Sequence, residues 1–155
     1  MKKIYRIAII STEREKFFRE LEVFHNHTFL DLHKAIQTAC DYDQSQLASF
    51  FILNTNFEKT MELTAAPMYE QTALYPTQWM GEYKLYELLN KPMQNLIYQF
   101  DLFSERSFII FLKKISPAHS TDIVPRILRS QGVPPRQIYR GESHIDNLLN
   151  AFSEN

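Results

Sequence analysis

One stretch of this sequence has the pattern of a long amphipathic helix, and it lies among segments that alternate like strands. Thr28 is a natural N-cap, and Asp31 three residues later can complete a capping box. Apolar side chains then recur at helical spacing on one stripe, namely Phe29, Leu32, Ile36, Ala39 and Cys40. This stripe predicts a helix over residues 28–41 that packs one face against a sheet.

The segments around this helix predict strands that pair as antiparallel neighbours. Residues 4–10 are rich in β-branched and aromatic side chains. Residues 17–24 fit a strand or a helix, and we prefer a strand because Phe17, Leu21 and Val23 share one parity. Two hairpins are predicted, from residues 49–53 with 57–63 and from residues 96–102 with 107–115.

These elements predict one α+β domain over residues 1–155, mainly an antiparallel sheet with one principal helix packed on it. The order strand, strand, helix, strand, strand is also that of a β-grasp start, which is an analogy of order only. Residues 83–90 predict a short helix. A last helix is predicted to begin at Ser143, with Ile145, Leu148, Leu149 and Phe152 on one side.

Two long segments show no regular pattern. Residues 64–81 contain Pro67, Pro76, two tyrosines and the single tryptophan, Trp79. Residues 116–141 contain four prolines and two of the three glycines. Irregular loops of this length are uncommon and are often functional, so the loop with Trp79 is a candidate partner-binding segment.

Composition excludes several classes of protein. With 17 basic and 18 acidic side chains, the net charge of −1 does not favour general nucleic-acid binding. Cys40 is the only cysteine, and three glycines are too few for a glycine-rich phosphate loop. No apolar run has the length of a signal peptide or a membrane span, so we expect a cytoplasmic protein without membrane contact.

The histidines give no metal-ligand pattern. His25 and His27 precede the long helix, but a zinc site needs further ligands and supporting hydrogen bonds. We interpret them as loop histidines and expect neither a metal nor another cofactor. His33 lies at the edge of the helical apolar stripe, about 60° from its centre at ~100° per residue.

The weak catalytic candidates are His33 and Asp101, with Arg106 as a third member. Asp101 interrupts an apolar strand and shares parity with Gln99, so alternation favours the solvent face for both. Acid–base catalysis needs hydrogen-bond reach and a shifted pKa, which a sequence does not supply. An enzyme is therefore the lowest-ranked of our function hypotheses.

Four arginines form the one local basic patch, Arg126, Arg129, Arg136 and Arg140, and residues 123–141 contain no acid. Such a patch can contact phosphates or an acidic partner. A solvated loop whose arginines pair with acids elsewhere is the preferred interpretation, because four arginines are fewer than a specific DNA footprint normally contains.

Three motifs occur in the order typical of one known family. They are Thr28-Phe29-Leu30-Asp31-Leu32-His33-Lys34-Ala35-Ile36-Gln37, Leu96-Ile97-Tyr98-Gln99-Phe100-Asp101, and Val124-Pro125-Arg126 with Gly132-Val133-Pro134-Pro135. Over nearly the whole chain the sequence resembles the plasmid pRiA4b open-reading-frame-three-like family, whose members also occur as passenger proteins of insertion sequences. It departs from the family pattern at residues 102–108, where Phe-Gly-Asp and Trp are usual, and at Arg136, where an acid is usual.

The resemblance implies a link to plasmids or mobile elements and no particular activity. Our leading hypothesis is a non-enzymatic accessory or interaction protein that binds another protein or a second copy of itself, with Trp79 among the contact residues. If so, Trp79 and the neighbouring tyrosines are expected to be exposed. DNA binding through the arginine patch is the second hypothesis, and an enzyme of unknown class is the third.

Overall fold

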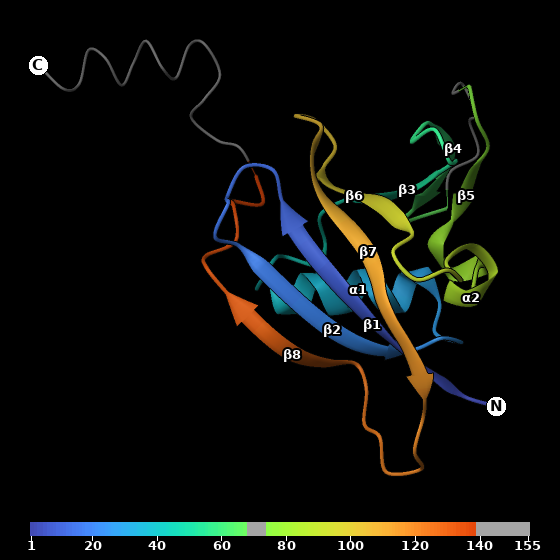
Figure 1. Cartoon of the computed structure of the whole chain (residues 1–155). Coiled ribbons are helices and arrows are strands. Elements are labelled where there is room, and N and C mark those ends of the chain that lie inside the picture. Colours follow the sequence, from blue (N-terminus) through green and yellow to red (C-terminus); the bar gives the residue numbers. More distant parts are fainter. Residues whose placement is uncertain (68–73, 139–155) are drawn as a thin grey trace, which may run out of the picture.

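The computed structural model describes residues 1–67 and 74–138, which form an eight-stranded sheet with one long helix on it. The strand order is β5-β4-β3-β6-β7-β1-β2-β8. All neighbouring strands are antiparallel except β4 and β5, which are parallel. Figure 1 shows α1 running across one face of the sheet. The predicted α+β fold with a mainly antiparallel sheet is confirmed.

The predicted start, strand, strand, helix, strand, strand, is also confirmed. In chain order the elements are β1 (Lys3–Ser11), β2 (Phe18–Phe24), α1 (Phe29–Ala39), β3 (Ser49–Leu53), β4 (Lys59–Thr64), β5 (Thr77–Trp79), a 3-10 turn (Met80–Glu82), α2 (Leu85–Leu88), β6 (Asn95–Asp101), β7 (Arg106–Pro117) and β8 (Arg126–Gln131). No helix among the described residues has the length and apolar character needed to cross a membrane.

The capping box starts α1 as the sequence predicts. The backbone N–H of Asp31 donates to Thr28 Oγ1 at 3.1 Å, and the backbone N–H of Thr28 donates to Asp31 Oδ2 at 2.9 Å. The apolar stripe of α1 is fully buried against the sheet at Phe29, Leu32 and Ile36. Helix and sheet therefore share one core, which fixes α1 across the strands (Figure 1).

Both segments interpreted as irregular contain a strand, and each of these strands forms an edge of the sheet. β5 lies within residues 64–81, and β8 lies within residues 116–141. β8 pairs with β2, roughly a hundred residues earlier in the chain, so its hydrogen bonds leave no local signature. Its side chains are mostly exposed, which removes the hydrophobic alternation that identifies a strand.

Candidate functional site

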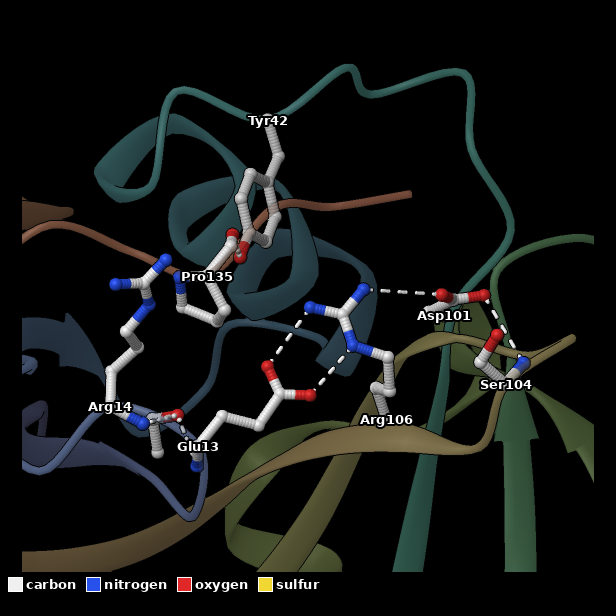
Figure 2. Close-up of polar contacts among 8 residues, drawn as sticks. Glu13, Arg14, Tyr42, Asp101, Ser104, Arg106 and Pro135 are labelled. Carbon is white, nitrogen blue, oxygen red and sulfur yellow. Dashed lines mark hydrogen bonds and ion pairs between the residues drawn. The ribbon is translucent and has the colours of Figure 1, made fainter. Parts of the chain in front are cut away.

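One arginine and two acidic residues form an ion-pair cluster at one end of the sheet. Arg106 begins β7, Asp101 ends β6 and Glu13 follows β1 (Figure 2). The Arg106 guanidinium donates to both carboxylate oxygens of Glu13, at 2.6 and 2.9 Å, and to Asp101 Oδ2 at 3.3 Å. A two-pronged pair of this kind fixes the guanidinium plane. The cluster therefore joins three chain segments and leaves Arg106 fully engaged.

Asp101 is buried, and the expectation that it lies on the solvent face with Gln99 was wrong for both residues. Each is only 8% exposed. The β6–β7 register shifts between Gln99 and Asp101, so simple alternation fails at this point. The Arg106 guanidinium also lies 5.1 Å from the Phe100 ring centre and covers the strand end. Asp101 thus acts as a structural partner of Arg106.

His33 belongs to a different, buried network under α1. Only 3% of it is exposed, and its Nδ1 lies 2.7 Å from the Tyr98 hydroxyl. Gln37 Nε2 donates to the same hydroxyl, so His33 and Gln37 share Tyr98 as a polar partner. Burial, and secondarily the charge of Lys34, lowers the pKa of His33 to about 4. The ring is therefore neutral near pH 7.

The two catalytic candidates have separate partners. His33 bonds to Tyr98, while Asp101 bonds to Arg106 and accepts from the Ser104 backbone N–H at 3.4 Å. Within residues 1–67 and 74–138, no hydrogen bond joins His33 to Asp101. The structure thus brings Asp101 together with Arg106 but places His33 in the helix–sheet core.

The arginines of the predicted basic patch are distributed over strand and loop. Arg126 donates to Glu22 at 2.8 Å and to Asp122 at 3.2 Å. The Arg129 guanidinium lies 5.3 Å from the centre of the Phe18 ring. Arg136 lies in the loop after β8, and Arg140 is outside the described residues. Much of the charge of Arg126 is therefore directed at the chain's own acids.

Trp79 ends β5 and is half-buried. Its indole lies over Gly81, where an added Cβ would be only 2.5 Å from the ring. Tyr75, also half-buried, packs edge-on against Phe51. These aromatic residues are thus neither free in solvent nor fully buried. Tyr69 lies outside the described residues.

An open groove separates α1 from the beginning of β8. One wall is a lateral stripe of α1, made of Asp31, Lys34, Ala35 and Thr38. The other wall is the segment that leads into β8, made of Val124, Pro125, Arg126 and Ile127. Leu21 of β2 forms the base, and the groove has a volume of about 600 Å³, within the usual range of binding pockets.

Arg19 holds one end of this groove together. Its guanidinium donates to the carbonyl of Ala39 at the end of α1 and to those of Gln131 and Gly132 at the end of β8. Gly132 has a φ of +70°, and a Cβ there would meet the Lys16 carbonyl oxygen at 2.4 Å. The end of β8 is therefore tied to the end of α1 through Arg19, and the groove lies between α1 and residues 124–127 at the beginning of β8.

The groove combines exposed apolar side chains with cations at its rim. Ile127 faces the groove and is 49% exposed, although its cross-strand partner Leu21 is buried. Lys34 and Arg126 lie on opposite walls. His27 lies at the other end, where its buried Nδ1 has no hydrogen-bond partner among the described residues. Sequence reasoning missed this site because its helical wall is mostly polar and its other wall was interpreted as a loop.

The described residues contain no group of three or more His, Cys, Asp or Glu side chains that could hold a metal ion. Cys40 is buried, and burial raises the pKa of its thiol to about 12.

The family model of the plasmid pRiA4b ORF-3-like protein matches residues 3–155 of this sequence. The chain belongs to this family. No curated protein matches it. In this ORF-3-like chain, residues 102–105 form the β6–β7 turn, and Arg106, the centre of the ion-pair cluster, begins β7.

A solved structure with the same fold is that of the protein of unknown function MM3350 from Methanosarcina mazei Go1. It is 21% identical to this ORF-3-like chain with a TM-score of 0.69, and the match covers 100% of this chain and 84% of that one. At this identity the likeness shows a shared fold.

Proposed function

We propose that this ORF-3-like domain is a non-enzymatic accessory protein of plasmids or related mobile elements that binds a protein partner in the α1–β8 groove. The observation that carries the proposal is the groove itself. Its wall at Val124, Pro125 and Ile127 is apolar and accessible, and Ile127 is half exposed beside a buried neighbour. Exposed apolar surface next to polar groups is typical of interaction sites.

The groove indicates the chemistry of the partner. It runs along α1, so it suits an amphipathic helix that lies beside α1 and inserts apolar side chains between the two walls. Lys34 on the helical wall favours an acidic residue on the polar flank of that helix. We therefore propose an acidic amphipathic helix of another protein as the ligand.

The polar clusters support a binding role over catalysis. His33 is neutral and bonded to Tyr98, and Asp101 is paired with Arg106. A general base needs access to substrate and a pKa near the working pH. DNA binding ranks below protein binding because Arg126 already pairs with Glu22 and Asp122.

The proposal is tested by selecting peptides from a displayed library of helical sequences against the full chain. Selected peptides are expected to carry apolar residues at positions i, i+3, i+4 and i+7 with flanking acids. Replacing Ile127→Asp puts a carboxylate in the groove and should weaken binding at least about tenfold.

Leu128→Asp is the matched control, because Leu128 is 38% exposed on the same strand and does not line the groove. Its affinity for the selected peptides should remain that of the wild-type chain. Failure to select any helical peptide, or equal losses in the two variants, would contradict the proposed site.

A further inference from the structure

We infer that the face of the sheet opposite α1 binds single-stranded DNA across β7, β1, β2 and β8. This surface lies on the other side of the sheet from the groove, so the inference is independent of the proposed protein partner. Cations on this face contact the phosphates, and aromatic rings stack on the bases, so the DNA is bound without recognition of a particular sequence.

Strand alternation places one set of charged side chains on this face. Ile7 of β1 and Leu21 of β2 belong to the core that these strands share with α1. Their neighbours Arg6 and Glu22 therefore point away from the helix, onto the opposite face of the sheet (Figure 1). Glu22 lies opposite Arg6 on one side and opposite Arg126 on the other, so charged residues of three adjacent strands meet there.

The charged groups of this face are arranged with the acids inside and the cations outside. The four strands contain eight lysines and arginines and two acids, Glu20 and Glu22. The two carboxylates lie 3.5 and 3.6 Å from the Arg6 guanidinium, and Lys113 donates to Glu20 at 2.8 Å. The acidic side chains are 8% exposed or less, against 34% for Arg6 and 40% for Lys113. The face therefore presents mainly positive charge to solvent.

Aromatic rings lie among these cations at both ends of β2. The Arg129 guanidinium and the Lys113 ammonium lie 5.3 and 6.0 Å from the centre of the Phe18 ring. The Lys2 ammonium lies 4.4 Å from the centre of the Phe24 ring. Both rings are half-buried and lie about 20 Å apart along the strand. A stacked base and a phosphate contact can therefore be made side by side at each end of β2.

This pattern favours single-stranded DNA over other anionic ligands. A duplex keeps its bases stacked in pairs and presents none of them to Phe18 or Phe24. RNA recognition uses contacts to the 2′-hydroxyl, and the carboxylates on this face that could accept from it, Glu20 and Glu22, are already paired with cations. An acidic protein surface would use the cations but would not require the rings.

Fluorescence anisotropy of a labelled oligothymidine of about 20 nucleotides with the full chain tests the inference. Binding is expected in the micromolar range at about 50 mM salt and should weaken as the salt concentration rises. Arg129→Gln removes one phosphate contact and should lower the slope of log affinity against log salt by about 0.7. Lys34→Gln is the matched control, because it removes an exposed cation from the α1 side, and its slope should stay that of the wild-type chain.

Phe18→Leu tests the stacking separately from the charge. Leucine keeps an apolar side chain at this position but removes the aromatic ring, so binding at fixed salt should weaken at least about fivefold. Phe57→Leu is the matched control, since Phe57 is 70% exposed in the β3–β4 turn, outside these four strands. Its affinity for the oligothymidine should not change. Circular dichroism verifies that each variant is folded.

The absence of binding at about 50 mM salt would overturn the inference. A duplex of the same length that binds as tightly would also overturn it, since no base would then need to stack on the protein. Tighter binding of an oligouridine would overturn the choice of DNA in favour of RNA. Wild-type affinity in Phe18→Leu would contradict stacking and leave a basic surface without preference for single strands.

Discussion

The side of α1 that faces β6 and the side that faces β8 differ in how their polar and apolar groups are satisfied. Toward β6, the buried side chains of His33 and Gln37 both bond to the Tyr98 hydroxyl. Toward β8, the apolar Ile127 is half exposed, and His27 Nδ1 has no partner among the described residues. Polar residues inside the core are thus structural, and the open surface is where binding is expected.

In the ion-pair cluster of Arg106 with Glu13 and Asp101, the charged groups are likewise satisfied within the fold. Breaking this cluster should cause the largest loss of folding stability. Arg106→Met leaves the buried Asp101 carboxylate without its charge partner and is expected to destabilise the fold by about 3–5 kcal/mol. The control Arg14→Met removes an exposed arginine beside Glu13 and should cost less than about 0.5 kcal/mol. Urea denaturation measures both, and equal losses would show that the cluster is not structural.

The buried imidazole of His33 should also make folding stability depend on pH. Its folded pKa of about 4 lies below the unfolded value near 6.5, so the unfolded chain takes up the proton first. Stability from this group is complete above pH 6.5 and is lost as the pH falls toward 4, by about 3 kcal/mol.

His33→Asn places an amide oxygen near the position of Nδ1 without a titrating ring. Denaturation curves at several pH values should therefore show a shallower fall in stability for this variant between pH 6.5 and 4. Parallel curves for wild type and variant would contradict a buried neutral imidazole at this position.

Tyr98→Phe removes the hydroxyl that His33 and Gln37 share and leaves both side chains without this partner in the core. The expected loss is about 2 kcal/mol. Tyr86→Phe on the exposed α2 is the matched control and should change stability by less than about 0.5 kcal/mol. Thermal unfolding followed by circular dichroism compares the two variants. A Tyr98→Phe variant as stable as the wild type would contradict a stabilising role for this hydrogen-bond network.

Substitutions in the groove between α1 and β8 should change folding stability little and peptide affinity strongly. Ile127→Asp is expected to reduce the free energy of unfolding by about 1 kcal/mol or less, because this side chain is already half exposed. A loss comparable with that of Arg106→Met would indicate that Ile127 belongs to the core. Urea denaturation under the same conditions gives the comparison.

Local patterns predicted the elements that carry their own signals. The capping box of Thr28 and Asp31, the apolar stripe after it and both central hairpins are visible in short windows of sequence, and the structure confirms them. These signals arise from interactions within a few residues along the chain or between adjacent strands. The family resemblance is confirmed by the match over residues 3–155.

Non-local contacts explain what the sequence did not reveal. The burial of Asp101 depends on Arg106 and on a register shift between β6 and β7. β8 is a strand because it pairs with β2, a contact that short windows of sequence do not contain. The groove also depends on a non-local contact, since one wall is α1 and the other is a segment about ninety residues later in the sequence. The predicted roles of Trp79, Arg129, Arg136 and Arg140 stay predictions, with Arg140 outside the described residues.

Hydrogen–deuterium exchange of the full chain, with and without a saturating selected peptide, tests the central claim most directly. The account predicts slowed exchange in residues 31–38 and 124–127, the two walls of the groove, with little change elsewhere. Protection centred instead on Trp79 and β5, or on the Glu13–Arg106–Asp101 cluster, would contradict the groove as the binding site.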